Sequence, residues 1–326
     1  MENDAIVFEG LFKDFCTRFV GYMQNLGFKY GVSSQRFLLY VNRMLNDTVE
    51  GDMPIITRAM ADRVAELRNG ESKGTRQGRV SLLRRLAHFI ILDGGSAYVF
   101  PKGILPVYRS DFTPYVFSHM QMDEVICSFE NLIPSGRSEI HVILPVLIKL
   151  LYSSGLRVSE ALSLTVGDYN NSDNSLLIRE SKNFKSRIVP LSKSMGAVLV
   201  RYLELTNPGE NAGRLVFPSP KGRKLNLAYV GKLIKSVYGK AGIPMNMQGV
   251  SPNTHSLRHT FAVHALEQMH GHGLNSYLSI ALLSQYLGHV SITETEKYLR
   301  LPQYKINGDE TIPLHSGRVP EVLYEE

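Results

Sequence analysis

The residues best suited to chemistry lie between Thr254 and Tyr298. His255 and Arg258 are three positions apart in T-H-S-L-R-H, so on a helix they share a face. His289 precedes Tyr298 by nine positions in the second motif, L-G-H-V-S-I-T-E-T-E-K-Y. A guanidinium is a permanent cation that pairs with phosphate oxygens, and an imidazole relays protons near neutral pH. A tyrosine oxygen becomes a covalent nucleophile when its neighbours stabilise the anion. Together these groups predict a site that breaks a phosphodiester bond.

A further arginine and two lysines lie upstream of these motifs. Arg157 follows Gly155 at the end of a strongly apolar segment, and this position indicates that its head group points into a cleft. Glu160, three residues later, is a candidate to orient it. Lys182 and Lys185 lie in E-S-K-N-F-K-S between two β-like runs, 174–178 and 187–191, so a hairpin tip is expected to carry them. A lysine at such a tip is more often simply solvated.

Apolar spacing predicts a mainly α-helical fold with a small β-sheet. The first hundred residues read as a small all-α domain, and a Gly- and Pro-rich stretch over 94–114 reads as a connector. Ser118 is expected to cap the first helix of a second domain. The expected helices span 5–26, 33–45, 55–67, 75–92, 120–131, 138–152, 192–205, 227–241, 274–287 and 293–301, with another beginning at 254.

The charge balance favours an anionic partner. The formal net charge is +6 and the pI is about 9.1. A basic series runs from Arg58 to Arg85, and a second cluster follows in the loop 218–224. An isolated run of this kind is usually a solvated face, so the interpretation depends on the downstream motifs. The candidates for contact with DNA are Arg76, Arg79, Arg84, Lys185, Lys221, Arg223 and Lys224.

Several other classes of function receive little support. Cys16 and Cys127 are far apart, so a structural disulfide is not expected. The acidic start of the chain does not resemble a signal peptide, and the most apolar segment, 140–151, is too short to span a bilayer. His255 and His259 have i, i+4 spacing, but neither a cysteine nor an H-E-x-x-H pattern accompanies them. We therefore predict no metal and no cofactor. For any one of these histidines, a packed core position is the plain alternative.

Four motifs occur together in one order. They are G-L-R-V-S-E-A-L at 155–162, S-K-N-F-K-S-R-I-V-P-L at 181–191, H-S-L-R-H at 255–259, and L-G-H followed by a tyrosine at 287–298. In this the sequence resembles the tyrosine recombinase family, which includes phage integrase-like and Xer-like proteins. The resemblance implies a helical core-binding domain at 1–100, a linker at 101–114, an α+β catalytic domain at 115–301, and a tail at 302–326 that is a candidate subunit-exchange segment.

The resemblance also implies roles for individual residues. Tyr298 would be the nucleophile, and Arg157 and Arg258 would bind the non-bridging oxygens of the scissile phosphate. Lys182 would protonate the leaving 5′ oxygen, with Lys185 as the alternative. His255 would assist proton transfer and His289 would donate a hydrogen bond to the phosphate. The segment between Arg258 and His289 is longer than the family pattern, with H-G-H-G inserted.

The expected function is that of a site-specific DNA recombinase or integrase that cuts and rejoins DNA through a 3′-phosphotyrosyl intermediate. The expected setting is a tetramer on double-stranded DNA recombination sites, in the bacterial cytoplasm and nucleoid, with a role in a mobile genetic element or in chromosome resolution and with accessory proteins as further partners. A type IB topoisomerase-like enzyme and a catalytically silent DNA-binding accessory protein are the alternatives. The complete set of six candidate catalytic residues argues against the silent protein.

Overall fold

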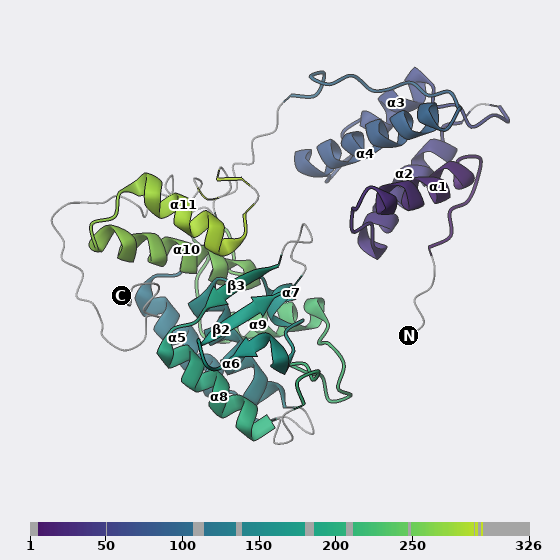
Figure 1. The fold of residues 1–326 in the computed structure, drawn as a ribbon. Coiled ribbons are helices and arrows are strands. Elements are labelled where there is room, and N and C mark those ends of the chain that lie inside the picture. The colour runs from purple at the N-terminus through teal and green to yellow at the C-terminus, as the bar shows by residue number, and fades with distance from the viewer. Residues whose placement is uncertain are drawn as a thin grey trace. The chain divides into compact units, whose positions relative to one another are not determined.

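The computed structural model describes residues 6–49, 51–106, 114–134, 139–179, 186–206, 211–246, 249–289, 291–292 and 295. The chain divides into two compact units, Met1–Phe112 and Thr113–Glu326, each of which is described by itself (Figure 1). Each unit has its own apolar core. Within the described ranges, no helix has both the length and the apolar character needed to cross a bilayer.

In its described residues, the first unit contains four helices. Two of them begin at side-chain caps, because the hydroxyl of Thr57 accepts from the amide of Met60 and that of Ser72 accepts from the amide of Thr75. Buried apolar side chains such as Phe19 join the helices in one core. The helices are α1 (Lys13–Asn25), α2 (Val32–Asn46), α3 (Arg58–Ala65) and α4 (Lys73–Leu92).

The start of α1 and the start of the connector predicted at 94–114 are two clear departures from the sequence-based prediction in this unit. Helix α1 begins well after the predicted start, because Gly10 has φ +77° and turns the chain. The carbonyl of Glu9 accepts from the side-chain amides of Asn42 and Asn46, which anchor the turn to α2. The predicted connector also begins later, since Phe100 is buried in the core of the first unit.

The second unit surrounds one central helix, α6 (Ile140–Ser154), which packs against α5, α8 and α10. The predicted cap at Ser118 is confirmed, because its hydroxyl accepts from the amide of Gln121 while the Gln121 side chain returns to the amide of Ser118. The other helices are α5 (His119–Glu130), α7 (Val158–Ala161), α8 (Lys193–Thr206), α9 (Leu227–Lys240), α10 (Thr254–Gly271) and α11 (Ser276–Leu287), with a 3₁₀ turn η1 (Val166–Asp168).

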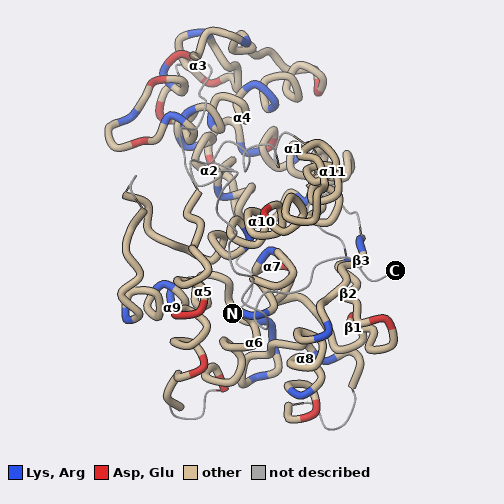
Figure 2. The backbone as a smooth tube through the Cα atoms, turned by 90° about the vertical axis from the view of Figure 1, so that its left-hand side faces the viewer, with Lys and Arg blue, Asp and Glu red and all other residues tan. Residues whose placement is uncertain are grey.

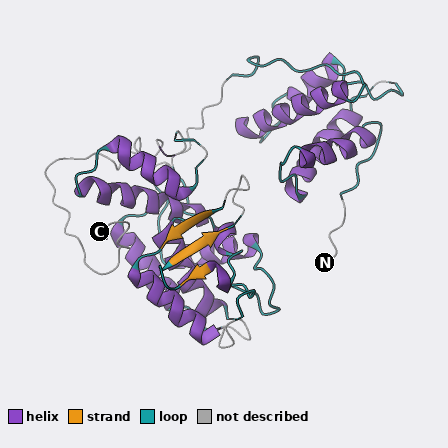
Figure 3. Ribbon diagram, in the orientation of Figure 1, coloured by secondary structure: helices purple, strands orange, loops and turns teal. Residues whose placement is uncertain are grey.

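Among the described residues of this unit, three strands form an antiparallel sheet. Strands β1 (Tyr169–Asn170), β2 (Ser175–Ile178) and β3 (Arg187–Pro190) lie in the order β1-β2-β3, drawn as orange arrows in Figure 3. The register pairs Leu176 with Val189 and Ile178 with Arg187. Leu176 and Val189 face the core, and the mainly helical fold with a small sheet is therefore confirmed.

Candidate active site

Four of the predicted residues come from the ends of three different elements. Arg157 immediately precedes α7, His255 and Arg258 lie in the first turns of α10, and His289 follows the end of α11. The positive charges of Arg157 and Arg258 act on the ring of His255, and those three residues act together on the ring of His289. The fold therefore brings these four side chains together, although up to 132 positions separate them in the sequence.

Arg258 is a buried link between two helix ends. Its side chain is 2% exposed, and Nη1 donates to the carbonyl of Gly155 at 2.7 Å while Nη2 donates to the carbonyl of Leu287 at 2.8 Å. These carbonyls belong to the ends of α6 and α11, where a helix leaves its last carbonyls without internal partners. Gly155 itself has φ +59°, and a methyl group added there would overlap the ring of Phe261. Arg258 thus holds the two chain segments that lead to Arg157 and His289.

Arg157 shares a carboxylate with a second arginine. Glu160 accepts from the backbone amide of Arg157 at 3.0 Å and from its Nη1 at 2.8 Å, so the predicted orienting role of Glu160 has a geometric basis. Arg187 binds the same carboxylate with both Nη atoms, at 3.1 Å and 2.9 Å. Burial alone would raise the pKa of Glu160, but the hydrogen bonds and charges of Arg187 and Arg157 lower it to about 2. Sequence reasoning did not select Arg187.

The two histidines remain uncharged near neutral pH. Desolvation lowers the pKa of His255, and the charges of Arg258 and Arg157 lower it further. The pKa of His289 falls to about 3, because it is desolvated and because Arg258 and Arg157 lie nearby. A neutral imidazole donates from one nitrogen and accepts at the other. Each neutral ring can therefore donate a hydrogen bond from its N–H, and the strongly lowered pKa of His289 makes it a donor rather than a base.

Thr295 is a second residue that sequence reasoning missed. Its hydroxyl oxygen lies 2.8 Å from Nδ1 of His289, and the residue is fully buried. Its amide donates to the carbonyl of Ile292, and Tyr298 follows three positions later in the sequence. When the hydroxyl donates to Nδ1, the ring proton lies on Nε2, which then becomes the donor. The sequence did carry one signal for this residue: Thr295 is a polar side chain between His289 and the candidate nucleophile Tyr298.

Three predicted residues lie outside the described part of the chain. They are Lys182, Lys185 and Tyr298. The loop 218–224 does lie beside the site, since Nζ of Lys224 donates to the carbonyl of Ser159 at 3.3 Å and also to the hydroxyl of Ser163, on the segment that follows Arg157. Lys221 and Arg223 on the same loop are exposed.

The predicted basic face of the first unit needs a correction. Lys and Arg positions recur along α3 and α4, marked in blue in Figure 2. Arg79, however, is fully buried and pairs with Glu71 at 2.5 Å, and it donates to the carbonyls of Val64 and Glu66. The structure contradicts an exposed position for Arg79, so we remove it from the predicted DNA-binding surface.

Arg76 and Arg84 also donate to backbone carbonyls. Nε of Arg76 donates to the carbonyl of Ala65, and Nε of Arg84 donates to the carbonyl of Phe100 at 2.7 Å. Both arginines keep part of their surface exposed, and Arg85 is exposed. Contact of these residues with DNA stays a prediction.

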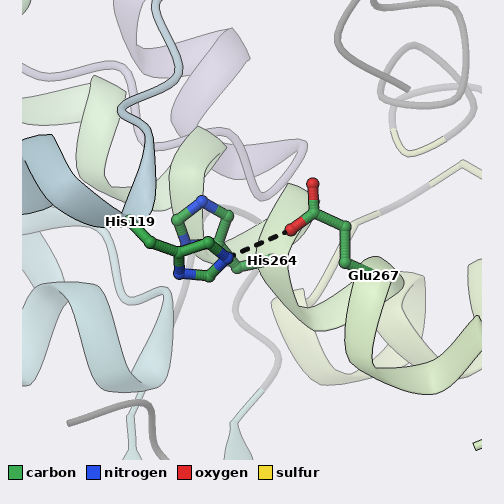
Figure 4. A group of neighbouring side chains, drawn as sticks. All are labelled: His119, His264 and Glu267. Carbon is green, nitrogen blue, oxygen red and sulfur yellow. Dashed lines mark ion pairs between the residues drawn. The ribbon is translucent and has the colours of Figure 1, made fainter. Parts of the chain in front are cut away.

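A separate cluster of ionisable side chains joins α5 to α10 (Figure 4). Ligand-type atoms of His119, His264 and Glu267 lie within 4.8 Å of one another. The two imidazoles are stacked, with centroids 3.8 Å apart and planes at 21°, and Nδ1 of His264 is 2.9 Å from the hydroxyl of Tyr152. A histidine binds a metal in the plane of its ring, and stacked rings do not direct two nitrogens at one point. This arrangement favours a packed pair in which Nε2 of His119 faces Glu267 at 3.4 Å.

Comparisons with known proteins identify the relatives of this chain. The family model described as "Phage integrase family" matches residues 125–304. Tyrosine recombinase XerD of Mycobacterium leprae is 31% identical over 188 residues, which are 55% of each chain. Tyrosine recombinase XerD of Neisseria meningitidis is 25% identical over 276 residues, which are 84% of this chain and 85% of the relative.

Solved structures share the fold. The XerH site-specific recombinase bound to palindromic difH substrate, a post-cleavage complex, has a TM-score of 0.66 and 20% identity, over 89% of this chain and 92% of that chain. The Tn1549 transposon integrase in complex with transposon right end DNA has a TM-score of 0.63 and 16% identity, over 87% and 94% of the two chains. The match of the family model to more than half of the sequence, over the site described above, shows that this chain belongs to the phage integrase family of tyrosine recombinases, enzymes that cleave and rejoin DNA.

Proposed function

We propose that this recombinase cuts DNA at specific sites through Tyr298, which attacks the scissile phosphate and leaves a 3′-phosphotyrosyl link. The O–P bond to tyrosine forms as the bond to the 5′ oxygen breaks, and the 5′ oxygen takes a proton. The single observation that carries the proposal is the convergence of Arg157, His255, Arg258 and His289, with the histidines held neutral beside two guanidiniums. Fixed cations and hydrogen-bond donors of this kind stabilise the charge of a transferring phosphoryl group.

Each side chain has a proposed part in the reaction. Arg157 and Arg258 bind the non-bridging phosphate oxygens, and His289 donates to the same group. His255 accepts the proton of the tyrosine, and its depressed pKa leaves it unprotonated near neutral pH and able to do so. Lys182, or Lys185 in its place, protonates the leaving 5′ oxygen. The reverse attack of the 5′ hydroxyl rejoins the strand without ATP, because the phosphotyrosyl link conserves the energy of the bond.

The proposal extends to the setting of the reaction. We infer a tetramer on two duplexes, since strand exchange needs two DNA sites with two cut strands each. The tail 302–326 is the proposed exchange segment between subunits. The proposed place of the reaction is the bacterial cytoplasm and nucleoid, and its proposed role is in a mobile element or in chromosome resolution. The first unit, residues 1–100 in particular, is the proposed core-binding domain, followed by a linker at 101–114 and a catalytic domain at 115–301.

A labelled duplex with a nick near its cut site tests the proposal, because loss of the short fragment traps the covalent adduct. The substrate is found first: the protein is incubated with a pool of such duplexes whose centre is randomised, and the DNA of the recovered adduct is sequenced. We expect Tyr298→Phe to bind the recovered duplex and to form no adduct on a denaturing gel. Tyr304→Phe and Tyr286→Phe are the controls. Tyr286 stacks on Phe261 and donates to the carbonyl of Pro190, so it packs in the wall of the site.

An adduct that persists in Tyr298→Phe and disappears in Tyr304→Phe would overturn the assignment of the nucleophile. Cleavage is expected to continue in EDTA, since the proposed cations are side chains. Transfer of strands between two duplexes distinguishes a recombinase from a topoisomerase-like enzyme, which would relax supercoils without exchange.

A further inference from the structure

Arg187 begins β3 and directs its side chain to two other elements of the site. Its side chain is 13% exposed, and its Nη atoms bind both oxygens of Glu160. Its Nε donates to the carbonyl of Tyr286 at 3.2 Å, in the last turn of α11. A Cβ built on Gly288 would come within 3.2 Å of Cδ and Nη1 of Arg187, so the guanidinium lies directly against the residue that precedes His289.

Arg187 and Arg258 connect the same two segments by different atoms. Arg258 binds the carbonyls of Gly155 and Leu287, which are each two positions before Arg157 and His289. Arg187 binds the side chain of Glu160 and the carbonyl of Tyr286, each three positions from those same residues. Two cations therefore join the segment 155–160 to the segment 286–289.

The charge on Glu160 gives Arg187 a second effect. Glu160 has two cationic neighbours, so one negative charge is shared by two positive guanidiniums and one positive charge is left over. Without Arg187, the pair of Arg157 and Glu160 would be neutral, and the carboxylate would compete with a phosphate for the Nη1 atom of Arg157. Glu160 is 8% exposed, so water screens this competition only weakly.

We propose that Arg187 is a positioning residue of the recombinase: it binds Glu160 so that Arg157 keeps its charge for the phosphate, and it holds the end of α11 so that His289 faces that phosphate. The inference rests on the roles proposed above for Arg157 and His289. It adds a residue whose own side chain need not touch DNA.

Three variants and one control test the proposal. Arg187→Met keeps the length of the side chain and removes its charge and donors, while Arg187→Lys keeps the charge. Arg187→Met combined with Glu160→Gln removes both charges and leaves that of Arg157 uncompensated. The control is Arg179→Met, which removes another arginine–carboxylate pair beside the sheet, between Arg179 just after β2 and Asp168 at the end of η1, at a distance of 2.5 Å between Nε and Oδ1.

Cleavage is measured in single turnover on the nicked duplex recovered as described above. We expect Arg187→Met to slow adduct formation about 10- to 100-fold, the range for a residue that orients another side chain of the active site. The affinity for the duplex should stay unchanged. Arg187→Lys should retain more activity than Arg187→Met, and the double variant should recover about tenfold over Arg187→Met, because the charge balance at Arg157 is restored. The control should cleave like the unchanged protein.

A second readout needs no DNA. Arg187 is one of the charges that lower the pKa of His289, so the imidazole of His289, followed by NMR in the free protein, should titrate at a higher pH in Arg187→Met than in the control. An unchanged titration together with undiminished cleavage would overturn the proposal. A double variant no faster than Arg187→Met would overturn the role of the Glu160 charge. Failure of the unchanged protein to form an adduct on any duplex would instead refute the proposed function, and the titration would still decide whether Arg187 acts on His289.

Discussion

At the scale of single residues, the site works by shared hydrogen bonds. One carboxylate, that of Glu160, receives four donors from two arginines, and one hydroxyl, that of Thr295, contacts the ring of His289. The partners of a side chain decide which protonation state and which tautomer it has. The chemistry of Arg157 and His289 therefore depends on residues that need not touch a substrate themselves.

Replacement of Thr295 tests this dependence. Thr295→Val has nearly the same shape and lacks the hydroxyl, so Nδ1 of His289 loses its partner at 2.8 Å and the proton is no longer directed to Nε2. We expect adduct formation to fall about 10- to 100-fold with little change in DNA affinity. Thr295→Ser keeps the hydroxyl and is the control. Equal rates in the valine and serine variants would show that the hydroxyl has no part in orienting His289.

At the scale of elements, the ends of helices carry the site. Helices α6 and α11 each stop at a glycine in the left-handed region, Gly155 at φ +59° and Gly288 at φ +66°. Glycine adopts this conformation without the steric cost that other residues incur. Their final carbonyls then point at Arg258 and Arg187.

Gly155→Ala is therefore expected to destabilise the fold strongly. The methyl group adds the cost of a left-handed residue to an overlap with the Phe261 ring, and together these should lower the free energy of unfolding by about 2–4 kcal/mol. Gly273→Ala is the matched control, since Gly273 has φ +81° but open space around its Cα. Chemical denaturation measures both. Equal losses in the two variants would mean that packing against Phe261 contributes nothing.

The contact between α6 and α10 has a pH dependence of its own. Burial and the charge of His119 lower the pKa of His264 to about 4, from an ordinary value of 6.5. The unfolded chain therefore takes up this proton first, and the free energy of unfolding should decline as the pH falls from about 6.5 to 4, by roughly 2–3 kcal/mol from this residue. His264→Gln removes the titration and should flatten part of that slope. His289 contributes to the same range, so some slope remains.

At the scale of the whole molecule, two units with separate cores are expected to share the binding of DNA. Exposed cations in the first unit, such as Arg85, and in the loop 218–224 of the second unit are the candidates for phosphate contacts in both. Counterions released from DNA make such binding sensitive to salt. We expect the surface charges to contribute affinity for DNA, and the side chains at the junction of α6, α10 and α11 to contribute the chemistry.

A salt series separates a surface arginine from a buried one. Arg85→Gln should weaken binding to every DNA sequence by a similar factor. It should also reduce the slope of the logarithm of the binding constant against the logarithm of the salt concentration by about one. Arg79→Met should leave the slope unchanged and lower the stability of the first unit by about 3–5 kcal/mol, because Glu71 would stay buried without its partner. A flat salt dependence in the unchanged protein would rule out phosphate contacts as the source of affinity.

The sequence was sufficient for the fold class, while the roles of the candidate catalytic residues stay predictions. Motif order identified Arg157, His255, Arg258 and His289, and Ser118 correctly marked the start of α5. What sequence reasoning missed depends on contacts between distant segments. The charge pattern of α4 does not distinguish buried Arg79 from exposed Arg85. The residues around β3 in the sequence likewise do not indicate that Arg187 binds Glu160. The late start of α1 likewise follows from two asparagines on α2.

Arg258 and Arg187 donate to main-chain carbonyls, and this decides which changes of sequence the junction tolerates. A carbonyl is the same whichever side chain its residue carries, so conservative replacements at Leu287 and Tyr286 leave these hydrogen bonds in place. A single inserted residue within α11 would instead rotate everything beyond it by about 100° and turn both carbonyls away. Insertions in the turn after α10 escape this penalty, because it lies before α11 begins. Among related sequences, insertions and deletions should therefore occur around residues 272–275, while the length of α11 stays constant.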